Sequence, residues 1–408
     1  MKAGAHADTS LKFWAGGMDV RQKHWSVWLF AGILGWIPLG ASGGGVYAAN
    51  LTPPAPVSAK AAELLDGQSG RVLYEKNAYE KLPMASVTKL MTLVLVLQAV
   101  HAKKLGLNEL VPVSEEAYRV GGSQIWLEPG ERMTVEQLIR AVAVGSANDA
   151  AYALGEYLAG SPDAFVAEMN RTARQWGMVS THFANPHGLH DPNHYTTAHD
   201  LGILALHALH TPGLLDYTRM REDRTIRNGK GGTLWLVNSN RLLRTYPGTD
   251  GLKTGYTSQA GFCLVATAKR GDTRMVSVIL GAPSSKNRFH DAAELMTWGF
   301  MHYETVAIAR KGQLFGTVRI RRGTQRMVGV RATSDTYVTV PKDQTALTRT
   351  VVIPPEVGAP VTTTRPIGKI VVKQGSQVLM TVSLYPTASV PALGWGQGVW
   401  RWFWRITG

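Results

Sequence analysis

Ser86 and Lys89 are the two residues of this chain whose types and spacing are best suited to chemistry. They lie three residues apart at the start of an apolar stretch, so a helix there would place the hydroxyl and the amine on one face. A serine needs a neighbouring base to act as a nucleophile, and a lysine can serve if burial or a nearby cation lowers its pKa. Ser-x-x-Lys also occurs by chance, and the alternative is a helix-capping serine beside a surface lysine.

Two later motifs contain the residue types that such a pair would need. A second hydroxyl, on Ser146, could relay a proton, and the amide of Asn148 could hold a substrate carbonyl and the lysine. Lys253 and Thr254 could bind a substrate carboxylate, and Gly255 has no side chain to keep a substrate away from the backbone. Taken alone, the Ser-Ala-Asn motif could be no more than a turn that breaks a helix.

Apolar periodicity and turn signals predict the elements that position these motifs. The residues after Ser86 are apolar nearly all round, which is typical of a buried helix, and Ser146 should lie at a break in a helical segment. Strands at both ends with helices between predict an α+β domain whose terminal strands share one antiparallel sheet, with Lys253 on an edge strand. The expected elements are a hairpin over 61–79, helices over 86–101, 134–160, 161–177, 198–210 and 288–302, and strands over 251–256, 262–268 and 274–281.

The chain changes character after Tyr303. Short alternating runs between Gly and Pro turns predict a small all-β domain, for which a sandwich is one arrangement. The last segment, 391–408, carries four tryptophans on one helical face, with Arg401 and Arg405 opposite. This pattern favours an amphipathic helix in a membrane interface, and the alternative is a tail that packs on its own β domain.

The N-terminal stretch 1–48 is expected to be a signal peptide. Residues 25–39 are apolar, basic residues precede them, and small residues follow, with cleavage after Ala48 or Ala49. A start at Met18 would give an ordinary signal, so residues 1–17 could be a mis-called start. An uncleaved anchor is the alternative, and either places the protein outside the cytoplasm.

Composition narrows the classes of partner and chemistry. The 408 residues carry a net charge of +14 without a dense Lys/Arg block or a nucleic-acid module, which favours an anionic membrane or wall polymer over nucleic acid. Cys263 is the single cysteine and is expected to be an inert core residue, because no internal disulfide can form. Five histidines, at 182, 187, 190, 194 and 199, raise the possibility of a zinc site, but their turn-rich spacing favours a structural loop near the active site.

From about Ala61 to Tyr303 the chain resembles the D-alanyl-D-alanine carboxypeptidases, the low-molecular-mass penicillin-binding proteins. The order Ser-x-x-Lys, Ser-x-Asn, Lys-Thr-Gly is the signature of penicillin-recognising serine enzymes. The residues that carry the resemblance are Ala85-Ser86-Val87-Thr88-Lys89-Leu90-Met91-Thr92, Ser146-Ala147-Asn148-Asp149-Ala150, Gly177-Met178, Asn185-Pro186-His187-Gly188-Leu189 and Asp250-Gly251-Leu252-Lys253-Thr254-Gly255-Tyr256-Thr257.

The resemblance implies a penicillin-binding transpeptidase-like, β-lactamase-like catalytic domain over 50–303, a β-rich domain over 304–388 and a membrane-associating segment over 391–408. It implies that Ser86 attacks the bond between the terminal D-alanines of a peptidoglycan stem peptide, with Lys89 as base and Ser146 as proton relay. Backbone amides of Ser86 and Tyr256 would form the oxyanion hole, and β-lactams would acylate the same serine. The implied substrate-binding residues are Asn148, Lys253, Thr254, Gly255, Tyr256 and Arg288, the last near the substrate carboxylate.

No cofactor and no metal is expected, and the enzyme should be periplasmic, held at the outer face of the cytoplasmic membrane by its C-terminal helix. Three alternatives share the motifs or the architecture. The site could cut D-Ala–diaminopimelate cross-links as an endopeptidase, it could be a β-lactamase, or the protein could be a non-catalytic wall-binding scaffold.

Overall fold

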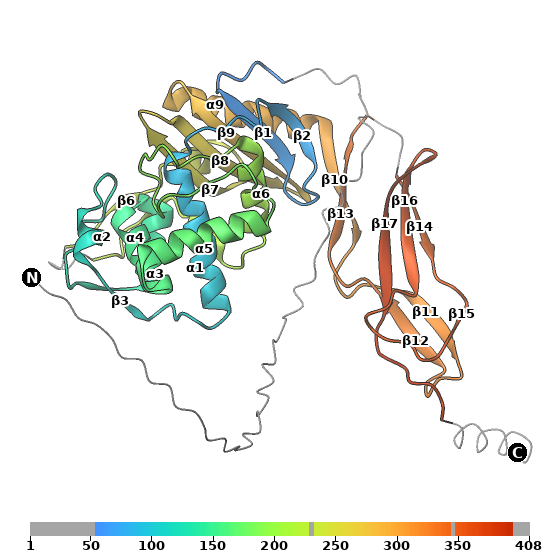
Figure 1. Cartoon of the computed structure of the whole chain (residues 1–408). Helices are drawn as coiled ribbons and strands as arrows, with labels where there is room; N and C mark the ends of the chain where they lie inside the picture. Colours follow the sequence, from blue (N-terminus) through green and yellow to red (C-terminus); the bar gives the residue numbers. More distant parts are fainter. Residues whose placement is uncertain (1–53, 228–231, 344–346, 395–408) are drawn as a thin grey trace, which may run out of the picture. The chain divides into compact units, whose positions relative to one another are not determined.

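A five-stranded antiparallel sheet forms the centre of the larger domain in this computed structural model, which describes residues 54–227, 232–343 and 347–394 (Figure 1). The strand order is β2-β1-β9-β8-β7, so the first two strands of the sequence join the last three of the domain and β7 lies at an edge. The expected hairpin, shared sheet and edge strand are therefore confirmed. The strands are β1 (Ala61–Asp66), β2 (Val72–Lys76), β7 (Thr249–Thr257), β8 (Gly261–Arg270) and β9 (Thr273–Ala282).

Alternate residues of the sheet face two separate apolar cores, because successive side chains of a strand point to opposite faces. On β1, Leu65 joins the core formed with α1, α4, α5 and α6, whereas Leu64 joins the core formed with α9. Helices therefore cover both faces of the sheet, which confirms the α+β fold. These helices are α1 (Lys89–His101), α4 (Asn148–Ala159), α5 (Pro162–Gln175), α6 (Ala198–Leu209) and α9 (Ser285–His302).

The helical segment expected over 134–160 is broken where Ser146 lies. Thr134 and Gln137 form a capping box that starts α3 (Val135–Arg140), and a π-helical turn, η2 (Ala141–Gly145), follows. Ser146 then takes left-handed backbone angles, with φ of 58°, before α4 begins at Asn148. The predicted break is confirmed, and it separates the Ser146 side chain from the regular helices on either side.

Several short elements were not expected, because runs of two to five residues are too short to show a periodicity. They build the walls of the helical side of the domain and the approach to β7. They are β3 (Leu110–Pro112), α2 (Glu115–Arg119), β4 (Arg132–Thr134), α7 (Leu214–Thr218), β5 (Glu222–Asp223), β6 (Leu236–Val237) and α8 (Leu242–Thr245).

The region after α9 is all-β, as expected. One sheet has the order β14-β16-β17-β12-β11-β15, and β10 pairs separately with β13. Ile308, Val318 and Ile370 belong to the apolar core that these strands share. The strands are β10 (Tyr303–Ala309), β11 (Leu314–Arg321), β12 (Met327–Arg331), β13 (Thr336–Pro341), β14 (Leu347–Val352), β15 (Glu356–Gly358), β16 (Gly368–Gln374) and β17 (Gln377–Pro386).

Within the described residues, no helix combines the length and the apolar character that crossing a bilayer requires. The expected signal peptide, 1–48, and residues 395–408 of the expected amphipathic segment lie outside the described residues.

Candidate active site

Ser86 and Lys89 lie together at the start of α1, as their spacing predicts. Ser86 belongs to a 3₁₀ turn, η1 (Ala85–Thr88), and the α-helix begins only at Lys89, which shifts the predicted helix start by three residues. The Lys89 side chain is fully buried, and its Nζ lies 2.9 Å from Ser86 Oγ. Its other partners are Asn148 Oδ1 at 2.6 Å and the carbonyl of His187 at 2.5 Å.

The surroundings of Lys89 favour the neutral amine that a base requires. Burial lowers the pKa of Lys89 well below its usual value, and the nearby charge of Lys253 lowers it further, whereas Asp149 acts in the opposite direction. This is the combination of causes expected from the sequence. An amine whose neutral form is favoured in this way, and which lies within hydrogen-bond distance of a serine hydroxyl, can accept the proton of that hydroxyl.

The backbone around Ser86 is enclosed by two glycines from distant parts of the chain. A Cβ on Gly188 would lie 2.0 Å from the Ala85 carbonyl oxygen, and one on Gly255 would lie 2.7 Å from the Met84 carbonyl oxygen. Neither position can therefore carry a side chain while this packing is kept. The close packing of β7 against η1 is therefore one reason for a glycine at position 255, and the expected close approach of a substrate there stays a prediction.

The second motif meets the third across the site. The left-handed backbone of Ser146 places its Oγ 2.9 Å from the Nζ of Lys253, whose side chain is buried. Lys253 Nζ also lies 3.1 Å from the Thr254 carbonyl. Burial, with the charge of Arg288, lowers the pKa of Lys253 to about 7. Ser146 thus has a titratable amine as its neighbour, which suits the transfer of a proton.

Asn148 joins the first motif to the loop between α2 and β4. Its amide oxygen accepts from Lys89, and its amide nitrogen donates to the Gly121 carbonyl at 2.7 Å. The next residue, Asp149, is buried and accepts from the backbone N–H groups of Ile125 and Leu127. Both partners of the Asn148 side chain therefore fix its orientation at the wall of the site.

The remaining predicted residues lie on β7 or behind it. Thr254 is buried, and its hydroxyl lies 2.5 Å from the hydroxyl of Ser239, a neighbour that the sequence did not single out. Tyr256 is 57% exposed and its ring packs on Phe262. Arg288 is buried and donates to the carbonyls of Gly255 at 3.1 Å and Cys263 at 3.3 Å, so its guanidinium supports the backbone of the strand.

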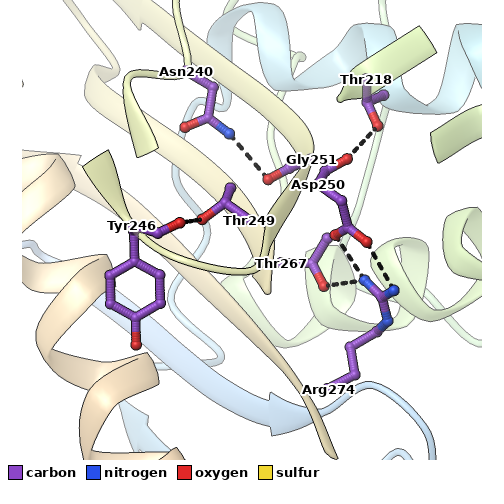
Figure 2. Close-up of polar contacts among 8 residues, drawn as sticks. All are labelled: Thr218, Asn240, Tyr246, Thr249, Asp250, Gly251, Thr267 and Arg274. Carbon is purple, nitrogen blue, oxygen red and sulfur yellow. Dashed lines mark hydrogen bonds and ion pairs between the residues drawn. The ribbon is translucent and has the colours of Figure 1, made fainter. Parts of the chain in front are cut away.

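A second network holds β7 at its N-terminal end (Figure 2). Arg274 on β9 makes two 2.8 Å contacts with the carboxylate of Asp250, and it also donates to Thr267 on β8. Thr218 and Asn240 donate to the carbonyls of Asp250 and Gly251. The residues just before Lys253 are therefore held through side chain and backbone alike.

The histidine-rich segment lies beside the first motif, which confirms the expected loop near the active site. The His187 carbonyl accepts from Lys89, and the ring of His194 contacts Thr88. Burial lowers the pKa of His187 to about 3 and that of His194 to about 4, so both rings are neutral. The sequence analysis did not assign His187 or His194 to the site. The only signal for His187 was its place directly before Gly188 in a turn-rich segment.

Cys263 is a free, buried residue of β8, as expected. Burial raises the pKa of its thiol to about 11, so the thiolate form is disfavoured.

Taken together, the three motifs form one polar cluster. It contains a serine beside a buried amine, a second serine beside a second amine, and an edge strand on which an extended substrate could lie. This arrangement can perform acyl transfer by nucleophilic catalysis.

Comparison with known proteins gives consistent results over most of the chain. Residues 48–284 match the family model of D-alanyl-D-alanine carboxypeptidases, and residues 303–392 match that of the penicillin-binding protein 5 C-terminal domain. The chain is 36% identical to D-alanyl-D-alanine carboxypeptidase DacF of Bacillus subtilis, over 79% of this chain and 83% of that protein. It is 38% identical to DacC of Escherichia coli, over 73% of this chain and 75% of that protein.

Solved structures agree with the sequence relatives. Penicillin-binding protein 5 from Haemophilus influenzae has a TM-score of 0.72 and 30% identity, covering 83% of this chain and 99% of its own. Penicillin-binding protein D2 from Listeria monocytogenes, solved in an ampicillin-bound form, has a TM-score of 0.55 and 36% identity over 61% of this chain and all of its own. With three motifs in one cluster and this extent of similarity, the chain belongs to the D-alanyl-D-alanine carboxypeptidase family.

Proposed function

We propose that this protein is a serine-type D-Ala-D-Ala carboxypeptidase that removes the terminal D-alanine from peptidoglycan stem pentapeptides. The observation that carries the proposal is the fully buried amine of Lys89, 2.9 Å from Ser86 Oγ, with a pKa lowered well below its usual value. The family membership supplies the substrate class. The ampicillin-bound form of the Listeria monocytogenes relative supports binding of β-lactams, and in this proposal they acylate Ser86.

In this mechanism Ser86 Oγ attacks the carbonyl carbon of the bond between the two D-alanines while the neutral amine of Lys89 takes its proton. Backbone N–H groups of Ser86 and Tyr256 donate to the oxyanion that forms. The tetrahedral intermediate then collapses, and the departing D-alanine amine receives a proton by way of Ser146. Water, activated by Lys89, hydrolyses the ester on Ser86 and regenerates the hydroxyl.

The other site residues bind the substrate in this proposal. The ammonium of Lys253 and the hydroxyl of Thr254 hold the terminal carboxylate, and the Asn148 amide holds a substrate carbonyl. Gly255 and Tyr256 supply strand backbone along which the peptide lies. Arg288 acts from behind β7, because its hydrogen bonds go to the carbonyls of Gly255 and Cys263.

The test is release of free D-alanine from a stem pentapeptide by a protein lacking residues 1–48, together with labelling by a fluorescent penicillin. Ser86→Ala should abolish both, whereas Ser258→Ala, at an exposed serine just after β7, should leave both unchanged. Cleavage only of cross-linked dimers would show an endopeptidase, and rapid turnover of the penicillin would show a β-lactamase. A wild-type protein that releases no D-alanine and takes no label would support the scaffold alternative and overturn the proposal.

We also propose that the enzyme is exported, with a catalytic domain over 50–303, a β-rich domain over 304–388 and a membrane-associating segment over 391–408. The apolar run over 25–39 and the tryptophan-rich, basic C-terminal sequence support this arrangement. Deleting residues 391–408 should abolish sedimentation with anionic vesicles, while binding of the full chain to neutral vesicles should be weaker. Equal sedimentation of the truncated and full-length proteins would contradict this part of the proposal.

A further inference from the structure

A chain of hydrogen bonds runs from the histidine-rich loop to the peptide just before the nucleophile. The backbone N–H of Ala184 lies 3.0 Å from Nδ1 of His194, and Nε2 of the same ring lies 2.6 Å from Oγ1 of Thr88. Thr88 Oγ1 in turn lies 2.7 Å from the carbonyl oxygen of Ala85. His194 and Thr88 are both buried, so this series of hydrogen bonds is shielded from water.

The groups at the two ends of this series of hydrogen bonds determine which atom is the donor in each bond. A backbone N–H can only donate, so Nδ1 of His194 is an acceptor and carries no proton. The ring is neutral, since burial lowers the pKa of His194 to about 4, and its single proton is therefore on Nε2. The Ala85 carbonyl can only accept, so the Thr88 hydroxyl donates to it and accepts from His194. Donors in such a chain polarise one another, which strengthens each bond.

The last acceptor in the chain determines where the Ser86 N–H points. The peptide between Ala85 and Ser86 is planar and trans, so its C=O and N–H point in opposite directions and a bond to one fixes the other. Ala85 has a φ of 48°, a left-handed conformation that a non-glycine residue keeps only when its surroundings impose it. Packing against Gly188 and the bond from Thr88 are two such constraints.

We propose that His194 is a positioning residue that, through Thr88, aims the Ser86 N–H at the oxyanion of the tetrahedral intermediate. This inference rests on the proposed function, in which that N–H is one of the two oxyanion donors. His194 itself touches neither substrate nor nucleophile. Its contribution should therefore be seen in the transition state, where the oxyanion exists, and much less in binding of the substrate.

Thr88→Val, which replaces the hydroxyl by a methyl group of similar shape, tests the last bond. We expect a folded protein whose rate of acylation by a fluorescent penicillin and kcat for D-alanine release fall about 10- to 100-fold, with little change in KM. Binding of a peptide boronic acid, which forms a tetrahedral adduct with the serine, should weaken in parallel with kcat. Thr88→Ser keeps the hydroxyl and should restore most of the activity.

The matched control is Thr92→Val. Thr92 lies one turn further along α1, is equally buried and donates to the Pro186 carbonyl at 2.7 Å, so it ties the same helix to the same loop without touching Ala85. It should leave acylation close to the wild-type rate. If Thr92→Val slowed acylation as much as Thr88→Val, the cause would be the attachment of the helix to the histidine-rich loop and not the orientation of the Ala85–Ser86 peptide. That result would overturn the inference.

Two substitutions of His194 keep the proposal testable if Thr88→Val does not fold. Asparagine can replace Nδ1 as the acceptor for Ala184 but is too short to reach Thr88, whereas glutamine can place a donor near the position of Nε2. We expect His194→Gln to acylate faster than His194→Asn, and the reverse order would overturn the inference. A wild-type protein without carboxypeptidase or penicillin-binding activity would instead refute the proposed function, so the two failures are distinguishable.

Discussion

The two sides of the active site each contain a buried lysine, and they use it differently. On the helix side, Lys89 makes three hydrogen bonds, one of them to the nucleophile Ser86. On the strand side, Lys253 contacts Ser146 and the carbonyl of its neighbour Thr254. Burial lowers the pKa of both amines, but the second cation that adds to the effect is Lys253 for Lys89 and Arg288 for Lys253.

This difference teaches that position and neighbours, more than residue type, determine the role. Lys89 is enclosed between α1, α4 and the histidine-rich loop and touches the hydroxyl that must lose a proton. Lys253 lies on an edge strand where an anionic ligand could approach, and such a ligand would favour its charged form. The same side chain therefore suits a base on the helix side and a carboxylate receptor on the strand side.

The largest effect should come from removing the base. Lys89→Met keeps the approximate volume of the side chain and removes the amine, so acylation by penicillin and D-alanine release should fall about 10⁴-fold or more. Pre-steady-state acylation measures this directly, and Lys103→Met, at an exposed lysine beyond the end of α1, is the control. If Lys89→Met kept about a tenth of the wild-type activity, another residue would have to be the base.

Removing the strand-side lysine should give a smaller loss that depends on the substrate. Lys253→Met should lower kcat/KM about 100-fold for a peptide ending in a free carboxylate, because a charge-assisted hydrogen bond contributes roughly 1.5–3 kcal/mol. The same peptide with a C-terminal carboxamide should lose much less. Equal losses for the two substrates would argue that Lys253 serves the chemical step through Ser146 instead of the carboxylate.

The pH dependence should separate the two lysines in the wild-type enzyme. Lys89 must be neutral to act, so kcat/KM should rise with pH, and this limb should lie well below pH 10.5 because its pKa is lowered. Lys253 must be protonated to attract the carboxylate, so kcat/KM should fall above about pH 7. With the carboxamide substrate, kcat/KM should rise with pH but should not fall again above pH 7. An equal fall with that substrate would contradict the role of Lys253 as the carboxylate receptor.

The smallest effect on activity should follow from loosening the anchor of β7. Arg274→Gln breaks the paired contacts to Asp250, which are only partly exposed, and we expect the free energy of unfolding to drop by about 2–3 kcal/mol. kcat/KM should change only a few-fold, because Thr218 and Asn240 still hold the strand backbone. The control is Arg119→Gln in an exposed pair with Glu115, for which denaturant unfolding should show a change below about 0.5 kcal/mol.

Much of the catalytic domain could be predicted from the sequence, because its long elements have strong patterns. The apolar run after Lys89, the three strands from Thr249 to Ala282 and the break at Ser146 all appear where expected. The α-helix α1 begins three residues later than the sequence pattern predicts, because the left-handed Ala85 and the 3₁₀ turn depend on packing against distant segments. Two- and three-residue strands such as β5 and β6 leave no periodic signal at all.

The candidate site could be predicted in its chemistry but not in its contacts. Motif order identified Ser86, Lys89 and Lys253, and the lowered pKa of Lys89 followed from burial and a second cation. The partner of Lys89 in the histidine-rich loop is a backbone carbonyl, which any residue type could supply. The hydroxyl pair of Ser239 and Thr254 depends on how the segment between β6 and α8 lies against β7, which no local pattern encodes.

The hydrogen bonds of Lys253 and Arg288 given above all go to uncharged oxygens, although the charge of Arg288 lowers the pKa of Lys253. When Lys253 is protonated, these two like charges repel each other in the folded protein, and an anion that enters the site would relieve part of the repulsion. A carboxylate ligand gains this relief in addition to its other contacts. It should therefore raise the melting temperature more than an uncharged ligand of similar shape. In a thermal-shift search for inhibitors, this protein would respond most strongly to acidic compounds, whether or not they acylate the serine.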